Sequence, residues 1–441
     1  MDFKTQYREK HITIPEAVEM LQSRQRLCAA MCASEPVGLL SELENHADRL
    51  EDVHVFMCLP MRRYSFYTEP EMAGHFFLEN WFYGVPDRKA HKLGMVSYVP
   101  NNLHRAAADR IHAGGIEVFW GTATPPNNHG IMSLSTSLVF ERQLIDDADL
   151  VILEINENLP WTLGDTQIHI SEVDYLVENQ MPLVELPAIE PTEVEDAIGQ
   201  YIADLIEDGS TIQLGIGGIP NAIAMSLFDK KDLGVHTEMF TDGMVDLFEA
   251  GVITGKHKTL WPHKLVGTFA LGTQKLYDFI DNNIAVEFQQ GKVTNDPYVI
   301  ARNYKMVSIN TALQVDVLGQ VCSQSLGSYH FSGTGGQLDT HRGAQMSEGG
   351  RGIIALRSTA KGGEISTIVP QLSQGAEVTV PSQDVDTIVT EHGVAELRGR
   401  SVKDRVDALI NVAHPDFRDE LREEVRRLGI VPTLVAPGAD L

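Results

Sequence analysis

The chain has 441 residues, more than one compact core usually holds, so we expect two domains of roughly 200 residues each. Acidic residues outnumber basic ones by 61 to 35, and the formal net charge of −26 disfavours nucleic acid and anionic membranes as partners, because both repel such a surface. No apolar run approaches the ~18–20 residues of a membrane span, and the polar N-terminus has no apolar signal segment, so a soluble cytoplasmic protein is expected.

Short apolar segments alternate with helical patterns along the whole chain. Apolar strands that alternate with helices are typical of parallel sheets whose two faces are covered. We therefore predict an α/β fold of two tandem domains, each an open, mainly parallel sheet flanked by helices. The main expected strands span residues 53–59, 116–120, 150–155, 211–214, 235–240, 305–309 and 387–390.

A proline-rich crossing separates the two halves. Three prolines fall within residues 181–193, and a run of apolar residues at helical spacing follows them. We predict an N-terminal domain over residues 1–185 and a C-terminal domain over residues 191–441.

A faint internal repeat indicates that the two domains are related. The segment DADLVILEIN, from Asp147, resembles DVDTIVTEHG, from Asp384: each has two aspartates, an apolar strand and a glutamate. The segment NNHGIMSLS, from Asn127, resembles VLGQVCSQS, from Val317, because each places a turn glycine before alternating apolar and polar residues. Two related domains in tandem explain both pairs.

Cysteine and histidine spacing predicts neither a disulfide framework nor a metal site. The chain has four cysteines, scattered along its length, and we expect Cys28 and Cys32 to be buried thiols. Its sixteen histidines form no H-x-x-x-H pattern and no pair with cysteine. We therefore predict that no metal is bound.

Residues 211–242 have the pattern strand, glycine loop, helix, strand. The loop contains Gly215, Gly217 and Gly218 and runs into a helix opened near Pro220. Strand–helix–strand connections leave the two strands parallel, and the free N–H groups at a helix start favour negative charge. The arrangement G-x-G-G-x-P is neither a dinucleotide fingerprint nor a P-loop. By itself it is equally compatible with a tight turn between strand and helix.

Glu238 lies on the second of these strands, so the carboxylate and the glycine loop should meet at the carboxyl edge of the sheet, where open α/β domains bind ligands. A glutamate with its ordinary pKa of about 4.3 is an anion at neutral pH and can attack a carbonyl without a base. Neighbouring backbone N–H groups can stabilise the resulting oxyanion by roughly 3–4 kcal/mol each. A lone glutamate near a strand end is otherwise a solvated surface residue. We expect His236, on the same strand face, to pack or hydrogen-bond.

Further motifs follow in order along the chain. They are LGIGGIPNAIA, GVHTEMFTDG, VSINTAL, SGTGGQLD, TAKGGEIS, TEHGVAELRGRSV and ALINVAHPDF, with NENLPWTLGDTQIHI, from Asn156, in the N-terminal half. Together they resemble the acetyl-CoA hydrolase/transferase family, and within it the 4-hydroxybutyrate and butyrate CoA-transferases. The resemblance covers nearly the whole chain and implies two CoA-transferase domains with the active site between them.

The resemblance also implies roles for individual residues. Glu238 would form a glutamyl-CoA thioester, with Asn295 of VTNDPYVI beside it as a second catalytic residue. A backbone N–H of Gly335 or Gly336 would serve the oxyanion hole, and Lys361 would bring positive charge to the CoA phosphates. Taken singly, such glycines are also typical of turns and such a lysine of a solvated surface. The implied CoA-contacting residues are Gly215, Ile216, Gly217, Gly218, Ile219, Leu313, Gly335, Gly336 and Lys361.

The implied reaction is ping-pong transfer of CoA between short-chain carboxylic acids, such as 4-hydroxybutyrate or butyrate and acetate. Coenzyme A is then a substrate, and no ATP, metal or redox cofactor is needed. If water attacked the same intermediate, the chain would be an acetyl-CoA hydrolase. An inert Glu238 would leave a non-catalytic CoA-binding protein. The expected partners are acyl-CoA, short carboxylates and a second copy of the chain in a homodimer.

Two features of the sequence concern the acyl pocket and its substrate preference, which the resemblance does not determine. Thr340 and Trp161 stand where the family usually has an aromatic residue and an arginine, respectively. Residues 64–83 contain eight aromatic side chains, which we interpret as an aromatic core or dimer contact in preference to part of the acyl pocket or its lid.

Overall fold

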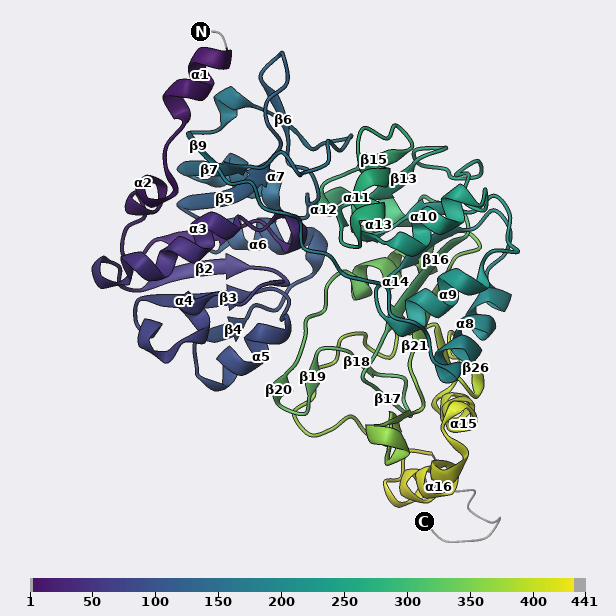
Figure 1. Cartoon of the computed structure of the whole chain (residues 1–441). Helices are drawn as coiled ribbons and strands as arrows, with labels where there is room; N and C mark the ends of the chain where they lie inside the picture. The colour runs from purple at the N-terminus through teal and green to yellow at the C-terminus, as the bar shows by residue number, and fades with distance from the viewer. Residues whose placement is uncertain (1–2, 432–441) are drawn as a thin grey trace, which may run out of the picture.

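Two large sheets, one from each half of the chain, form the body of the protein (Figure 1). The computed structural model describes residues 3–431, and within them the sheets have seven and eight strands. All pairs in the first sheet are parallel. Its order is β4 (Val96–Tyr98), β3 (Phe76–Asn80), β2 (Val53–Met57), β1 (Arg26–Ala29), β5 (Val118–Ala123), β7 (Leu150–Ile155) and β9 (Tyr175–Glu178).

The second sheet is parallel except at one edge, where β25 and β26 are antiparallel. The fold prediction of two mainly parallel sheets in tandem is thus confirmed. The order is β15 (Val286–Phe288), β13 (Leu265–Gly267), β11 (Gly234–His236), β10 (Thr211–Leu214), β16 (Met306–Thr311), β21 (Arg351–Ala355), β25 (Thr387–Thr390) and β26 (Gly393–Glu396).

The strand order is the same in both sheets, as expected for related domains. The first strand of each half, β1 or β10, is the fourth strand from one edge, and the strands that follow extend first to one side and then to the other. By this order β7 corresponds to β21. The proposed match between the segments at Asp147 and Asp384 is therefore wrong by one strand, because it pairs β7 with β25.

Helices cover the sheets on both sides (Figure 1). A capping box opens α8: the Thr192 backbone N–H donates to Glu195 Oε2 at 2.8 Å. The helices are α1 (Phe3–Lys10), α2 (Ile14–Glu19), α3 (Val37–Glu42), α4 (Ser65–Thr68), α5 (Val85–Lys92), α6 (Ala106–His112), α7 (Glu141–Asp147), α8 (Glu193–Leu205), α9 (Gly218–Ser226), α10 (Asp242–Glu249), α11 (Gln274–Ile280), α12 (Gly291–Thr294), α13 (Pro297–Ile300), α14 (Gln337–Met346), α15 (Val402–Val412) and α16 (Arg418–Arg427).

Smaller sheets join the loops at the carboxyl edges of the strands. β12 follows β11 and β14 follows β13 after short breaks in the strands. The hairpin of β19 and β20 reaches toward α5 of the N-terminal half (Figure 1). These strands are β6 (Ile131–Ser133) with β8 (Gln167–His169), β12 (Met239–Phe240) with β14 (Phe269–Ala270), β17 (Gln314–Asp316) with β18 (Val321–Cys322) and β24 (Ile368–Val369), β19 (Ser325–Leu326) with β20 (Tyr329–His330), and β22 (Thr359–Ala360) with β23 (Ile365–Ser366).

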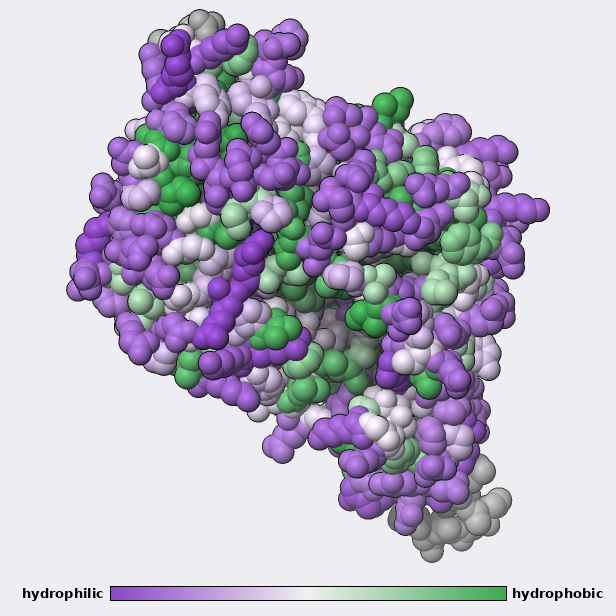
Figure 2. Space-filling view, in the orientation of Figure 1, coloured by the Kyte–Doolittle hydropathy of each residue, from purple (hydrophilic) through white to green (hydrophobic). Residues whose placement is uncertain are grey.

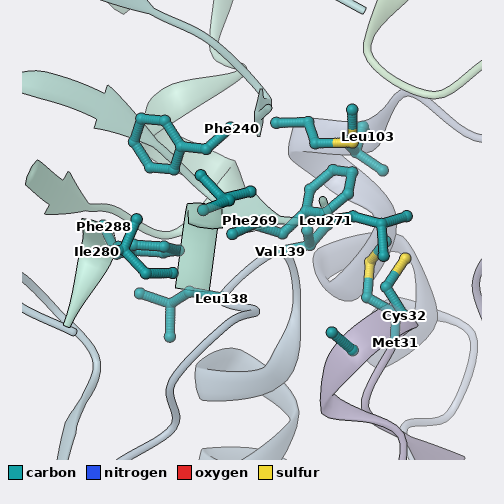
Figure 3. Packing of buried hydrophobic residues seen from close by; sticks show 14 of the residues in the cluster. Met31, Cys32, Leu103, Leu138, Val139, Phe240, Phe269, Leu271, Ile280 and Phe288 are labelled. Atoms are coloured by element: carbon teal, nitrogen blue, oxygen red, sulfur yellow. The ribbon is translucent and has the colours of Figure 1, made fainter. Parts of the chain in front are cut away.

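One hydrophobic core crosses between the halves. Leu138 and Val139 of the N-terminal half pack against Phe240, Phe269 and neighbouring side chains of the C-terminal half (Figure 3). Main-chain hydrogen bonds reinforce this contact: the Leu138 N–H donates to the Thr268 carbonyl at 2.8 Å. The boundaries at residues 185 and 191 stay a prediction. Among the described helices, none is both long and apolar enough to cross a membrane.

Candidate active site

Glu238 lies at the bend between β11 and β12, not within one continuous strand. The predicted strand over residues 235–240 is broken there, because β11 pairs with β13 while β12 pairs with β14. The Glu238 carbonyl accepts the N–H groups of Thr268 and Phe269 at 3.0 and 3.1 Å, which fixes the backbone on the neighbouring strand pair. The bend holds the Glu238 side chain at the carboxyl edge of the sheet.

Two donors from distant parts of the chain hold the Glu238 carboxyl group. The Asn295 amide donates Nδ2–H to Oε2 at 2.8 Å, and the Gly336 backbone N–H also hydrogen-bonds the carboxylate. A Cβ atom at Gly336 would lie 2.0 Å from both Glu238 Oε2 and Asn295 Nδ2. Only glycine therefore permits this approach of backbone to carboxylate.

Burial makes Glu238 a weaker acid than its type. The pKa of Glu238 is raised to about 7, chiefly because the carboxylate loses water on burial, and the charge of Asp339 raises it further. The hydrogen bonds from Asn295 and from the Gly336 N–H lower the pKa but do not offset this rise. The expectation that Glu238 is fully ionised at neutral pH therefore needs correction. Protonated and ionised forms coexist near pH 7.

His236 is structural, as the sequence indicated. Its ring is buried, and burial lowers its pKa to about 3, so the imidazole is neutral at physiological pH. Nε2 lies 2.9 Å from the carbonyl oxygen of Thr294, the residue before Asn295. The neutral ring therefore donates to this carbonyl and supports the segment that carries Asn295.

A cavity of about 200 Å³ opens beside Glu238, between the two halves. The surface is hollowed there, and hydrophobic residues gather around the hollow (Figure 2). Of the predicted site residues, Glu238, Gly215, Ile216, Gly335 and Gly336 line it. The N-terminal half contributes Met31, Cys58, Leu59, Phe82 and Leu103, and the C-terminal half adds Gln213, Leu214, Pro220, Met239, Phe269, Asn310, Thr311, Ser323, Ser332, Gly333, Thr334 and Gln337.

Other predicted CoA-contacting residues lie outside this lining. Gly217 has φ of 113° and is the N-cap of α9, while Gly218 packs against the Glu195 carboxylate, which is paired with Arg357 at 2.8 Å. Ile219 is buried in the core, and Leu313 lies on the segment between β16 and β17. Their roles in CoA binding stay predictions.

Lys361 is exposed at the tip of the hairpin formed by β22 and β23. It lies outside the cavity lining, so its contact with CoA phosphates also stays a prediction.

The aromatic segment is mainly core. Tyr64, Phe66, Tyr67 and Phe76 belong to a buried cluster under the N-terminal sheet, in agreement with the interpretation as an aromatic core. Phe82 differs because it lines the cavity and packs against the turn at Gly333 and Gly335. Composition gave no signal that would single out Phe82.

Thr340 belongs to a polar network beneath the cavity. Its hydroxyl lies 2.9 Å from Ser308 Oγ and 3.2 Å from Asn310 Nδ2, and Ser308 in turn donates to Gln213 Oε1 at 2.8 Å. Gln213 and Asn310 line the cavity. The Thr340 hydroxyl therefore supports two polar side chains of the cavity wall from behind.

Within residues 3–431, no group of three or more His, Cys, Asp or Glu side chains is arranged to hold a metal ion. Cys28, Cys32, Cys58 and Cys322 are buried free thiols. For Cys28 and Cys32 the expectation of buried thiols is confirmed.

Comparison with known proteins relates both halves of the chain to one family. The acetyl-CoA hydrolase/transferase N-terminal domain matches residues 1–186, and the C-terminal domain of the same family matches residues 272–425. A 4-hydroxybutyrate coenzyme A transferase of Clostridium kluyveri is 42% identical over 428 residues, which cover 97% of this chain and 100% of the relative. A succinyl-CoA:cyclohexane-1-carboxylate CoA transferase of Geobacter metallireducens is 41% identical over 430 residues, 97% of each chain.

A solved structure has the same fold along its whole length. The 4-hydroxybutyrate CoA-transferase of Porphyromonas gingivalis is 35% identical, and the match covers 97% of this chain and 100% of that one with a TM-score of 0.82. Sequence identity and fold agree over nearly the whole chain. The chain therefore belongs to the acetyl-CoA hydrolase/transferase family.

Proposed function

We propose that the chain is an acyl-CoA:carboxylate CoA-transferase in which Glu238 carries CoA between two acids. The observation that carries this proposal is the half-buried Glu238 carboxyl, held by the Asn295 amide and the Gly336 N–H at the wall of the cavity. The relatives named CoA transferases, which match over nearly the whole chain, support the same activity.

The first half-reaction loads CoA onto Glu238. The carboxylate attacks the acyl carbonyl of the donor acyl-CoA, and the C–S bond breaks to give an acyl–glutamyl anhydride and a CoA thiolate. The thiolate then attacks the glutamyl carbonyl, the C–O bond of the anhydride breaks, and the donor acid leaves as a carboxylate. Negative charge develops on the Glu238 oxygen during this attack, where Asn295 and Gly336 donate hydrogen bonds.

The second half-reaction reverses these steps with the acceptor acid. Its carboxylate attacks the glutamyl thioester, CoA thiolate leaves, and the thiolate attacks the acceptor acyl carbonyl to release Glu238. No proton is gained or lost overall, and the energy of the thioester is kept. The reaction therefore needs no ATP, metal or redox cofactor.

The cavity fits a short acyl chain. Met31, Phe82, Leu103, Met239 and Phe269 give it apolar walls near Glu238. We propose short-chain acids such as 4-hydroxybutyrate, butyrate and acetate as substrates; the first of these is the acid named for the relative from Clostridium kluyveri. We also propose that the protein is cytoplasmic and forms a homodimer.

The alternative is an acyl-CoA hydrolase, in which water replaces the acceptor acid. Both enzymes would use the same glutamyl-CoA. They differ in whether the loaded cavity admits water to the thioester. Only the fate of the intermediate separates them.

Intact-protein mass spectrometry after mixing with acetyl-CoA or butyryl-CoA tests the proposal. The wild type should gain a covalently bound CoA that is lost on adding acetate, and borohydride should reduce Glu238 to an alcohol and abolish activity. Glu238→Ala should gain nothing. Asn295→Ala, which keeps the nucleophile and loses one donor, should load CoA roughly 100-fold more slowly.

Two other results of this experiment would contradict the transferase proposal. If the wild type gains no CoA, the covalent mechanism is wrong, and a CoA-binding protein without this chemistry becomes the better account. If the adduct forms but decays in buffer without any acceptor acid, the chain is a hydrolase.

A further inference from the structure

An ion pair joins the two halves of the chain close to Glu238. His104, in the short 3-10 turn Leu103–Arg105, places Nδ1 2.9 Å from Asp339 Oδ1, and its backbone N–H donates to Asp339 Oδ2 at 3.2 Å. Leu103, one residue earlier, lines the cavity. The segment thus reaches both the cavity wall and the carboxylate of the opposite half.

Asp339 belongs to the element that holds Glu238. It lies in the first turn of α14, whose N-cap is Gly336, the residue that donates a backbone N–H to the Glu238 carboxylate. The Gly336 carbonyl accepts the Thr340 N–H at 2.8 Å, so the cap and the first turn form one rigid unit. A group that holds Asp339 therefore also holds the donor to Glu238.

The surroundings of His104 favour its charged form. Asp339 is buried, with a side chain only 3% exposed, and His104 is 22% exposed. Burial and the charge of Arg105 lower the pKa of His104. The contact with Asp339 and the charge of Asp296 raise it by more, so the pKa lies above its ordinary value. The turn that carries His104 also packs against α12, whose C-cap is Asn295.

We propose that His104 and Asp339 are positioning residues for the transfer reaction: the pair clamps the start of α14 to the N-terminal half and balances the Asp339 charge next to Glu238. The inference rests on the proposed function, because it concerns the orientation and charge of the Glu238 nucleophile. Neither residue lines the cavity, so both act on Glu238 indirectly, through the position of α14 and through the charge of Asp339.

The two members of the pair have opposite effects on Glu238. The negative charge of Asp339 raises the pKa of Glu238, so its removal should make Glu238 a stronger acid. Removal of His104 leaves Asp339 without its counter-charge, so Glu238 should become a weaker acid. A purely structural contact would not produce opposite shifts.

The test is the pH dependence of kcat/KM for acyl-CoA, which reports the ionisation of the free enzyme. Asp339→Asn should move the acid limb to lower pH, and His104→Ala should move it to higher pH, each by roughly half a unit or more. The double variant should follow Asp339→Asn, because His104 acts only through Asp339. At alkaline pH, loss of the clamp in His104→Ala should lower kcat by roughly 10-fold.

His54→Ala is a matched control. His54 Nδ1 lies 2.6 Å from Glu79 Oε1 within the N-terminal sheet, so its removal also breaks a histidine–carboxylate contact but should leave the profile unchanged. If Asp339→Asn does not fold, His104→Gln, which keeps an amide donor without the charge, should show the upward shift with a smaller loss of kcat.

Adduct formation by the wild type distinguishes failure of the positioning role from failure of the proposed function. If the wild type forms glutamyl-CoA but the limbs stay in place or move together, the positioning role is overturned and the proposed function stands. If the wild type forms no adduct, the proposed function fails and this role falls with it.

Discussion

The Glu238 carboxyl group is half-buried in the cavity wall, and its pKa rises to about 7 because the ionised form loses much of its water. Attack on a thioester requires the carboxylate, so only the ionised fraction of the enzyme can react. That fraction falls about tenfold for each pH unit below the pKa. The raised pKa places this loss within an accessible pH range.

We therefore expect the rate of CoA loading to rise with pH up to about 7 and then to level off. Rapid-quench mass spectrometry of the adduct between pH 5.5 and 8.5 measures this directly. Enzyme held at pH 5.5 and returned to pH 8 should regain its full rate, which excludes unfolding as the cause. A rate that stays constant down to pH 5.5 would mean that Glu238 has an ordinary pKa.

Gly336 is the second residue on which the site depends. Its φ of −90° is open to any residue, but a Cβ there would lie 2.0 Å from both Glu238 Oε2 and Asn295 Nδ2. Gly336→Ala should therefore slow CoA loading by roughly 100-fold or more while the protein still folds. Gly94→Ala, at an exposed turn with φ of +73° and nothing within 4 Å of the added carbon, strains the backbone away from the site and should still load CoA at nearly the wild-type rate. Near-normal loading by Gly336→Ala would show that this contact is not needed.

At the scale of elements, local sequence patterns predicted the secondary structure that local interactions determine. The strands over residues 150–155, 211–214 and 387–390 lie where they were expected, because each is a short apolar run between turns. The bend at Glu238 was missed, since it results from the pairing of β12 with β14 and not from any residue in the strand itself. A pattern in one segment contains no information about its partner.

The hairpin of β19 and β20 leads directly into the turn that lines the cavity. Arg88 of α5 donates Nε–H to the Phe331 carbonyl at 2.9 Å, and its guanidinium lies 3.6 Å from the centre of the Phe331 ring. The Tyr329 hydroxyl donates to the Arg88 carbonyl at 2.7 Å. These contacts dock the turn at residues 332–336 onto the N-terminal half.

Arg88→Ala should loosen this turn, since the ring contact alone is worth about 1–2 kcal/mol. We expect faster hydrogen exchange in residues 325–336 and a rise of several-fold in the KM for acyl-CoA. Lys92→Ala removes a more distant cation, 5.3 Å from the Tyr329 ring, and should have a smaller effect on both. Equal exchange in Arg88→Ala and the wild type would show that the hairpin is held by other contacts.

At the scale of the whole molecule, the site is built where two similar sheets meet. The C-terminal half supplies Glu238 and both of its donors, and the sequence identified these residues by family resemblance. The N-terminal half supplies Met31, Cys58 and other walls of the cavity, and no motif marked them. They come together only through the packing of one half on the other, which a single sequence does not reveal.

The shared core predicts that both halves unfold together. Leu138 is fully buried in the cluster that contains side chains from both sheets, whereas Leu43 is fully buried in a cluster formed by the N-terminal half alone. Truncation of a buried leucine to alanine costs about 2–5 kcal/mol. Because the large core crosses between the halves, opening one half exposes apolar surface of the other.

Differential scanning calorimetry should show one transition for the wild type, and both Leu138→Ala and Leu43→Ala should shift this single peak to lower temperature. Leu43→Ala is the sharper test, because Leu43 belongs to a cluster of the N-terminal half alone and its truncation should nevertheless destabilise the whole chain. If Leu43→Ala instead splits the peak and leaves a transition at the wild-type temperature, the halves unfold independently. The contact between them would then be a docking interface, which could open and close around the cavity that both halves line.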